Sequence, residues 1–395
     1  MGELDLNKVI DRNHTNCSKW DFNLENFGTQ DVLPMWVADM DFPAPPAVTE
    51  ALIERAKHPI YGYSRTDEEY YDLVVKWMKK RHGWESEKEW ITYAPGIVPA
   101  LNWMIQSYSK PGDKVIIQQP VYYPFGRAIR NNGRQIIDNP LVLKNGKYFM
   151  DYEDLEKKVD DPRVKILILC SPHNPVGRVW NKEELIRLGE ICFKRHIVVI
   201  SDEIHSDLIF KGYQHIPFAA ISEEFAQNCI VCNAPSKTFN LAGLQVSNII
   251  IPNQFLRNSF RNTLANQAIK SPNCFAIPAL KAAYRDGEQW LDAVMEYIED
   301  NYRFLITYIQ AKIPQIKVIK PEGTYLVWMD FSDLGMEPQE EREFLLKEAK
   351  VAFDEGPQFG PEGKGFERIN IACPRAILQE GLDRIQKAIY IRSAI

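Results

Sequence analysis

The sequence predicts an α/β protein with a large domain of three layers, α/β/α, around a mostly parallel sheet, and a smaller α+β domain. Two observations lead to this prediction. Short apolar, β-branched runs alternate with stretches of helical periodicity between about residues 90 and 251, which is the pattern of strands joined by crossover helices. A chain of 395 residues also exceeds what one hydrophobic core usually serves, and this favours a second domain.

The composition excludes several classes of protein. Hydrophobic residues make up 45% and charged residues 25% of the chain, as in ordinary globular proteins. The net charge of -6 and the lack of a basic run argue against nucleic acid or an anionic membrane as a partner. The N-terminal residues are polar, and no window of about 18 apolar residues occurs. We therefore expect a cytoplasmic protein that binds neither nucleic acid nor membrane.

The N-terminal part predicts an extended arm followed by a helix. Residues 34–46, PMWVADMDFPAPP, alternate apolar and acidic residues and end in prolines, which indicates an extended segment packed against another part of the chain. Thr66–Glu69 has the pattern of a capping box, and apolar residues follow at helical spacing until Gly83.

Six apolar runs predict the strands of the large domain. The run VKILILC is apolar throughout, as expected for a strand in the middle of a parallel sheet. Ala94-Pro95-Gly96 joins the first run to a helix, and the free N–H groups at such a helix start can bind a phosphate. Asn181, with Glu184 three positions later, caps another helix. The predicted strands are 90–93, 114–119, 164–170, 197–200, 229–233 and 246–251.

The last third of the chain predicts the smaller domain. Helical periodicity from Trp290 to Leu305 leads into a strand at 323–331, and a Gly-rich stretch at 359–366 precedes a final amphipathic helix. We expect residues 1–48 to form an N-terminal arm and part of this domain, residues 49–284 the large domain, and residues 285–395 the rest.

Polar residues cluster at the predicted carboxyl ends of the strands. Asn174, Asp202 and Lys237 each lie within a few residues of such an end, as do Tyr122 and the Gly96 turn. In open α/β sheets the ligand crevice lies outside these ends, so we expect the five loops to converge on one site.

The chemistry of these residues predicts a pyridoxal phosphate pocket. Lys237 follows a buried run and a Pro-Ser turn, where desolvation frees an amine for a Schiff base. Asp202 can keep a ring nitrogen protonated, Tyr122 can stack on a flat ring, and Asn174 can donate a hydrogen bond. The helix start after Gly96 supplies N–H groups for a phosphate.

Cysteines and histidines do not predict a metal or redox centre. The seven cysteines are odd in number and scattered, and Cys229 and Cys232 lie inside an apolar run without a second ligand pair, so we interpret them as buried small residues. His173 and His215 are interpreted as structural groups, whereas for His205 a structural and a functional role are equally favoured.

The order of these motifs resembles that of fold-type I pyridoxal phosphate enzymes of the aminotransferase class I/II superfamily, from about residue 30 to 390. It implies the PLP-transferase-like version of the fold. The phrases MWVADMDF, SPHNPVGRVW, SDEIHSDL and SKTFNLAGL are more closely similar to cystathionine β-lyases of the MalY/PatB type, also called C-S lyases. The superfamily motifs are Gly96-Ile97-Val98, Pro120-x-Tyr122, Ser171-x-x-Asn174-Pro175-x-Gly177, Asp202-x-x-His205, Ser236-Lys237 and Arg368-x-Asn370.

The resemblance implies a role for each residue at the cofactor ring. Lys237 would form the Schiff base with pyridoxal 5'-phosphate and then move the substrate proton. Asp202 would pair with the pyridine nitrogen, Asn174 would hydrogen-bond the ring O3', and Tyr122 would stack on the ring.

The resemblance also implies the phosphate contacts and a homodimer. Backbone N–H groups of Ile97 and Val98, together with Ser236, would bind the phosphate. A tyrosine of the YGY turn would reach it from the neighbouring subunit, and we prefer Tyr63 over Tyr61. The active site would then lie at the subunit interface. From the residues alone, this stretch predicts only a turn with two half-buried aromatic rings.

The expected substrate contacts are Arg368, which would fork onto the α-carboxylate, and Ala38 in the arm. Two positions depart from the aminotransferase pattern. His205 stands where those enzymes usually have a tyrosine, and Gln245 stands where many have a phosphate-binding arginine. The charge of the phosphate would then rest more on the N–H groups of the helix start.

The resemblance implies α,β-elimination from L-cystathionine or a related cysteine S-conjugate, which yields a thiol such as homocysteine, pyruvate and ammonia. An aminotransferase acting on amino acids and 2-oxo acids is the first alternative. The second is a regulatory protein that binds a transcriptional activator, since proteins of this kind are implicated in such binding.

Overall fold

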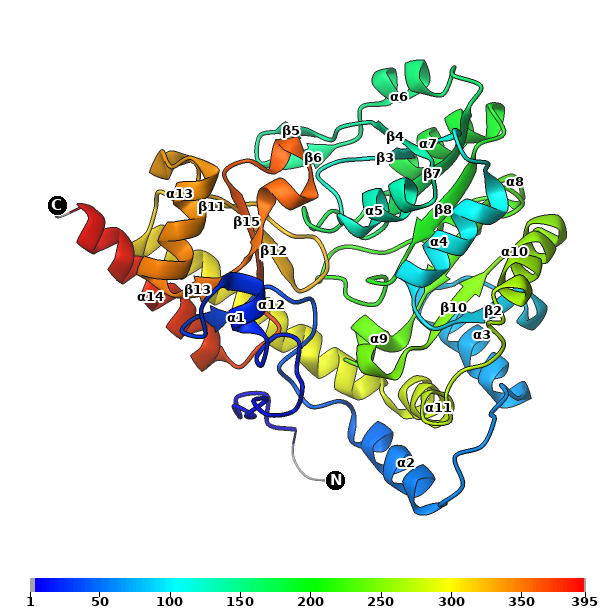
Figure 1. The fold of residues 1–395 in the computed structure, drawn as a ribbon, viewed down its shortest axis with the longest axis horizontal. Helices are drawn as coiled ribbons and strands as arrows, with labels where there is room; N and C mark the ends of the chain where they lie inside the picture. Colours follow the sequence, from blue (N-terminus) through cyan, green and yellow to red (C-terminus); the bar gives the residue numbers. More distant parts are fainter. Residues whose placement is uncertain (1–3, 394–395) are drawn as a thin grey trace.

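A seven-stranded sheet forms the centre of the protein, and the computed structural model describes residues 4–393 around it (Figure 1). Six strands run parallel, and only β10 is antiparallel to both of its neighbours. The predicted mostly parallel sheet is therefore confirmed. In spatial order the strands are β2 (Ile91–Ala94), β10 (Ser247–Ile250), β9 (Cys229–Asn233), β8 (Val198–Asp202), β7 (Val164–Cys170), β3 (Lys114–Ile117) and β4 (Gln135–Asp138).

The strands are apolar because both faces of the sheet are covered. Alternate residues of a strand point to opposite faces. In β7, Ile166 and Ile168 pack into one hydrophobic cluster, whereas Leu167 and Leu169 pack into another. The first cluster includes side chains of α4 (Ile97–Tyr108), α5 (Pro124–Asn131) and α10 (Gln254–Asn266). The second includes side chains of α3 (Glu68–His82), α6 (Tyr152–Lys158), α7 (Lys182–Lys194), α8 (Glu223–Ala226) and α11 (Ala276–Asp286).

A smaller α+β part follows in sequence, as predicted. Its four-stranded sheet is antiparallel, and β12 and β15 lie at its centre. The boundaries expected near residues 48 and 284 stay predictions. Its elements are β11 (Lys317–Val318), β12 (Leu326–Asp330), β14 (Asp354–Glu355), β15 (Phe366–Asn370), α12 (Glu288–Lys312), α13 (Pro338–Glu343), a π-helix (Phe344–Ala349) and α14 (Arg375–Ser393).

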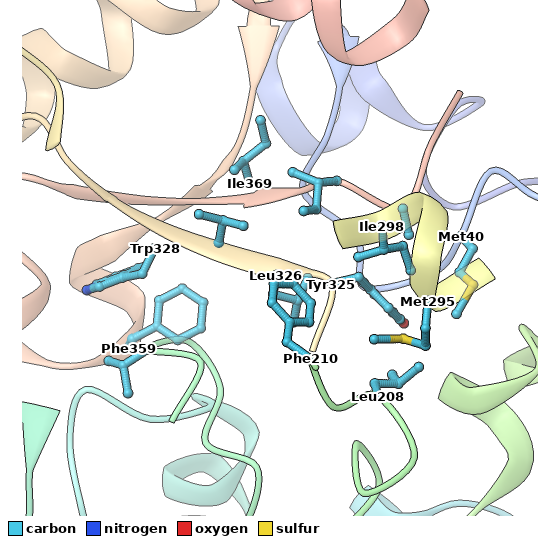
Figure 2. Packing of buried hydrophobic residues seen from close by; sticks show 14 of the residues in the cluster. Met40, Leu208, Phe210, Met295, Ile298, Tyr325, Leu326, Trp328, Phe359 and Ile369 are labelled. Carbon is cyan, nitrogen blue, oxygen red and sulfur yellow. The ribbon is translucent and has the colours of Figure 1, made fainter. Parts of the chain in front are cut away.

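Buried side chains join the two sheets into one molecule. Figure 2 shows Leu326 of β12 and the preceding Tyr325 beside Leu208 and Phe210 of the large sheet's loops, and all four are buried. Trp328 of β12 packs against Phe359. Met295 and Ile298 of α12 belong to the same cluster. The smaller part is thus packed against the edge of the large sheet at which β8 ends.

The N-terminal arm crosses this junction as the extended segment that the sequence predicts. The short strand β1 (Leu33–Pro34) pairs with β13 (Val351–Ala352), and the next residues bond to β15 and the loop after it. Asn370 N donates to Met35 O at 2.9 Å, and Asp41 N donates to Ala372 O at 2.9 Å. Besides short 3-10 helices, the other elements are α1 (Asn23–Phe27), α2 (Pro46–Lys57), α9 (Pro235–Thr238) and the hairpin β5 (Val142–Lys144) and β6 (Lys147–Phe149).

Helix ends show where local sequence rules hold and where they fail. The capping box of Asn181 and Glu184 is present, and Gly83 ends α3 with φ 66°. The capping box expected at Thr66–Glu69 is wrong. Asp67 is the N-cap and accepts a hydrogen bond from Tyr70 N, so the helix begins one residue later than expected. The third residue of the helix, where a capping box needs Glu or Gln, is therefore Tyr70.

The seven cysteines all lie within residues 4–393 and are free, with Cys229 and Cys232 fully buried in β9 as expected. Within residues 4–393, helices that are both long enough and apolar enough to cross a bilayer are absent.

Candidate active site

A cavity of about 220 Å³ opens at the carboxyl edge of the large sheet. Five loops supply its walls, namely those after β2, β3, β7, β8 and β9. The structure therefore brings together the loops that the sequence predicts to converge. The lining residues include Ala38, Gly96, Ile97, Val98, Tyr122, Asn174, Asp202, His205, Ser236, Lys237 and Gln245.

Lys237 projects into this cavity from α9, the short helix that follows β9. Its Nζ donates a hydrogen bond to Ala38 O at 2.7 Å. Burial lowers the pKa of Lys237 to about 8. The positive charge of Arg368 also lowers this pKa, whereas the carboxylates of Asp39 and Asp202 raise it. At neutral pH a far larger share of this amine is uncharged than of an ordinary lysine.

Asp202 ends β8 and is buried at the base of the cavity. Its Oδ1 accepts a hydrogen bond from Ile204 N at 3.2 Å. Burial raises the pKa of Asp202 to about 7, even though this hydrogen bond and the charge of Lys237 favour the carboxylate. A cationic ring nitrogen placed against Asp202 would supply the close partner that its carboxylate needs.

Arg368 of β15 does not itself line the cavity but lies directly behind Asn174, which does. Its Nη1 donates to Asn174 Oδ1 at 3.0 Å, and its Nη2 donates to Trp36 O at 2.8 Å and lies 2.5 Å from Asp354 Oδ2. The guanidinium is 2% exposed, and its Nε has no hydrogen-bond partner among residues 4–393. Arg368 is therefore a buried, oriented cation with an unused donor, which suits a carboxylate ligand.

Asp354 is a partner of Arg368 that the sequence does not reveal. In the antiparallel register it stands opposite Arg368 on the neighbouring strand β14. Burial raises the pKa of Asp354, while the charges of Arg368 and Arg127 act against the rise. No local motif marks this aspartate, because its pairing arises only when β14 and β15 come together.

The predicted phosphate contacts lie at one end of the cavity. Ile97 and Val98 begin α4, whose first N–H groups have no acceptor within the helix. Gly96 precedes them, and Ser236 lines the same cavity from α9. Gln245 also lines the cavity, with φ 55°. A phosphate at this end would meet N–H and hydroxyl donors and the positive end of a helix.

Tyr122 and His205 form further parts of the wall. Burial raises the pKa of the Tyr122 hydroxyl, and Tyr122 N donates to Asn174 O at 3.1 Å. His205 is 4% exposed, and burial holds its pKa well below the ordinary value. Its Nδ1 lacks a hydrogen-bond partner within the described part of the chain. Burial thus favours the neutral imidazole, whose Nδ1 is without a partner among residues 4–393.

Tyr61 and Tyr63 are not brought into this cavity. They lie on the connection between α2 and α3, where Tyr63 is fully exposed and Tyr61 is 57% exposed. Tyr61 donates to Ala56 O at 3.0 Å, and its ring packs on that of Phe275. Within one chain the turn is thus more exposed than the two half-buried rings that we expect from the residues alone.

A buried network holds the Lys237 loop from behind, and the sequence gives no signal for it. Thr238, the neighbour of Lys237, donates through Oγ1 to Asp207 Oδ2 at 2.8 Å. Asp207 also accepts from Trp77 Nε1 at 3.1 Å and lies 2.9 Å from His82 Nε2. Asp207 thereby links Thr238 of α9 to Trp77 and His82 of α3.

The two histidines interpreted as structural are buried outside the cavity. His173 Nε2 lies 2.9 Å from Pro120 O, and burial lowers its pKa to about 4. His215 Nε2 lies 3.0 Å from Glu203 Oε2. Both contacts fit the structural interpretation.

Known proteins resemble this chain over nearly its whole length. The family model for aminotransferase class I and II matches residues 30–385. Cystathionine beta-lyase PatB of Bacillus subtilis is 47% identical over 98% of this chain and 100% of its own. Crystalline cystalysin of Treponema denticola, which contains a pyridoxal 5'-phosphate cofactor, is 41% identical, with a TM-score of 0.96 over 99% of this chain and 100% of its own.

A PLP-bound C-S lyase of Staphylococcus hominis is 35% identical, with a TM-score of 0.92 over 98% of both chains. The family model covers most of the chain, and PatB matches it from end to end at well above 30% identity. This chain belongs to the aminotransferase class I and II family.

Proposed function

We propose that this protein is a pyridoxal 5'-phosphate-dependent carbon-sulfur β-lyase that cleaves L-cystathionine or a related cysteine S-conjugate. The observation that carries the proposal is the pairing of Lys237 and Asp202 in one cavity, where burial lowers the pKa of the amine to about 8 and raises the pKa of the carboxyl to about 7. The 47% identity to cystathionine beta-lyase PatB supports the choice of a lyase.

The cavity fits pyridoxal phosphate at each end. The amine of Lys237 can hold an aldehyde covalently, and Asp202 can pair with a protonated pyridine nitrogen. The N-terminus of α4 and Ser236 offer donors for the phosphate. Asn174 and Tyr122 stand beside the space between these ends and would hold the ring.

When bound, pyridoxal phosphate withdraws electrons from the α-carbon of an attached amino acid, which makes its α-proton acidic and allows a β-thiolate to leave. The chain supplies the groups that work around it. Arg368 would bind the substrate α-carboxylate and so orient the α-proton toward Lys237. Lys237 Nζ, with its pKa lowered to about 8 by burial, would accept that proton and could pass it to the departing sulfur.

Ala38 holds the amine of Lys237 in the absence of a covalent link. Its carbonyl accepts from Lys237 Nζ at 2.7 Å and from the Tyr325 hydroxyl at 2.8 Å. We propose that the released amine returns to this acceptor during each cycle, within reach of the substrate. Ala38 would thus border the substrate as well as the lysine.

We further propose a homodimer in which the exposed turn of Tyr61 and Tyr63 completes the partner's site. The extended, exposed position of this turn supports the proposal, because one chain alone leaves both rings outside its own cavity. Tyr63 is the preferred phosphate contact.

The domain boundaries and the cytoplasmic location also remain predictions.

The direct test is a product assay on purified protein supplied with pyridoxal phosphate. L-Cystathionine should yield pyruvate and a free thiol, and the Lys237→Ala variant should yield neither. Conversion of 2-oxo acids to amino acids without release of pyruvate would overturn the lyase proposal in favour of an aminotransferase. Borohydride reduction followed by peptide mapping should place the cofactor on Lys237.

The regulatory alternative has a separate test. A protein that acts only by binding an activator should keep its effect on transcription in the Lys237→Ala variant, whereas an effect that depends on catalysis should disappear.

A further inference from the structure

A second cavity, of about 170 Å³, lies next to the first, between α5 and the smaller part of the molecule. The strand end and loop after β3 form one wall, the outer face of α5 forms another, and Gln358 closes it from the smaller part. Tyr122 lines both cavities, which therefore adjoin at this residue. The residues of this second cavity, named here the Arg127 cavity, are Ile117, Gln119, Val121, Tyr122, Tyr123, Gly126, Arg127, Arg130 and Gln358.

Two positive charges in the Arg127 cavity have no acidic partner. Within residues 4–393, neither Arg127 nor Arg130 forms an ion pair, although most arginines of the chain do. Arg127 instead lies with its Cζ 4.7 Å from the centre of the Tyr123 ring. This stacking orients the guanidinium and leaves its N–H donors free for an anion.

A line of rings joins Arg127 to the proposed binding point of the substrate α-carboxylate. Arg368 Cζ lies 5.0 Å from the centre of the Phe359 ring, and Phe359 meets Tyr123 edge to face at 5.6 Å. The Tyr123 ring in turn contacts the guanidinium of Arg127. Burial raises the pKa of Asp354, and the positive charges of Arg368 and Arg127 both oppose this rise. The guanidinium groups of Arg368 and Arg127 therefore lie within electrostatic reach of the same carboxylate.

We propose that the Arg127 cavity binds a carboxylate carried by the leaving thiol, so that Arg127 and Arg130 make the enzyme prefer thioethers with an anionic leaving group. The inference rests on the proposed lyase function and specifies its substrate class. A substrate held by Arg368 at its α-carboxylate would lay its thioether chain past Phe359 and Tyr123. An acidic group at the far end would then meet a guanidinium that forms no ion pair within residues 4–393 and is oriented by the Tyr123 ring.

Two matched substrates test the charge preference in the holoenzyme. S-(2-carboxyethyl)-L-cysteine and S-(2-carbamoylethyl)-L-cysteine have the same shape and differ only in an acid against an amide. The kcat/KM of the acid should exceed that of the amide about tenfold, because a single charge-assisted hydrogen bond at a partly exposed site changes binding by about this factor. Arg127→Gln should bring the ratio close to one and leave the amide substrate within about twofold, whereas Arg127→Lys should keep part of the preference.

Arg187→Gln is the matched control, because Arg187 also stacks on a tyrosine, with its Cζ 4.3 Å from the centre of the Tyr152 ring, and lies outside both cavities. It should leave the ratio unchanged. Equal kcat/KM for the acid and the amide in the unaltered enzyme, or an equal loss for both in Arg127→Gln, would overturn the inference.

A binding measurement separates this inference from the proposed function. If neither these conjugates nor L-cystathionine is cleaved, the lyase proposal fails, but titration of the holoenzyme with 3-(methylthio)propanoate and its amide still decides the role of the cavity. Tighter binding of the acid that is lost in Arg127→Gln supports an anion site. Equal binding of both compounds, or none, refutes it.

Discussion

Replacing Asp207 by asparagine should destabilise the protein by about 3 kcal/mol, because it removes a buried charge on which three donors converge. The donors are Trp77 Nε1 at 3.1 Å, His82 Nε2 at 2.9 Å and Thr238 Oγ1 at 2.8 Å. A hydrogen bond to a charged group contributes about 1 kcal/mol more than one to a neutral group. The asparagine side chain keeps one oxygen that can accept hydrogen bonds from these donors. Its NH₂ group is itself a donor, so at least one of the three donors would lose its acceptor.

The effect should depend on pH in a defined direction. Burial by itself raises the pKa of Asp207, but the contacts with His82, Thr238 and Trp77 outweigh it and hold the pKa below the ordinary value of 3.8. A lowered pKa means stability that is present above the unfolded-state value and is lost as the pH falls through the folded-state value. The difference between the two proteins should therefore be full at pH 7 and shrink in acid.

Urea unfolding of the cofactor-free proteins measures this difference, since a bound cofactor would add its own stabilisation. Asp292→Asn is the matched control, because this exposed carboxylate pairs with Arg81 at the surface and should contribute less than about 1 kcal/mol. A loss of under about 1 kcal/mol for Asp207→Asn would refute the assignment of the network as the support of α9.

Three further results are expected. In the cofactor-free protein, acylation of Lys237 should rise with pH through about 8, as followed by peptide mass spectrometry, and Arg368→Met should move the midpoint upward because a neighbouring positive charge is removed. Arg368→Lys should lower kcat/KM about a hundredfold, since an ammonium cannot replace a fork that bonds Asn174, Trp36 and a carboxylate at once. Gly356→Ala should cost about 3 kcal/mol in thermal or urea unfolding because its Cβ would collide with the backbone of Gly363 and Phe366, whereas Gly243→Ala, which meets no atom within 4 Å, should be neutral.

The sequence predicts the parts of the site that depend on one strand at a time. Asp202 ends β8, and Lys237 follows β9 within a few residues, so a buried strand and the rule for parallel sheets place both at one edge. The same reasoning places Asn174 beyond β7 and Tyr122 beyond β3.

Contacts between distant elements escape such reasoning. Asp354 meets Arg368 because of strand register, and Asp207 meets Thr238 because a loop folds beneath α9; neither pairing has a local pattern. The cap of α3 fails for a related reason. Two adjacent residues, Thr66 and Asp67, can both cap a helix, and only the folded backbone decides between them.

The carbonyls of the N-terminal arm have a consequence for the biosynthesis of the protein. Trp36 and Ala38 leave the ribosome early, yet Arg368, which bonds the Trp36 carbonyl, lies 332 positions later, and Tyr325, which bonds that of Ala38, lies 287 positions later. The reactive amine of Lys237 is made between them and has its resting acceptor in place only once the late strands have docked on the arm. A chain whose synthesis stops before β15 lacks Arg368, the proposed carboxylate anchor, so the proposed site can assemble only after β15 has been made.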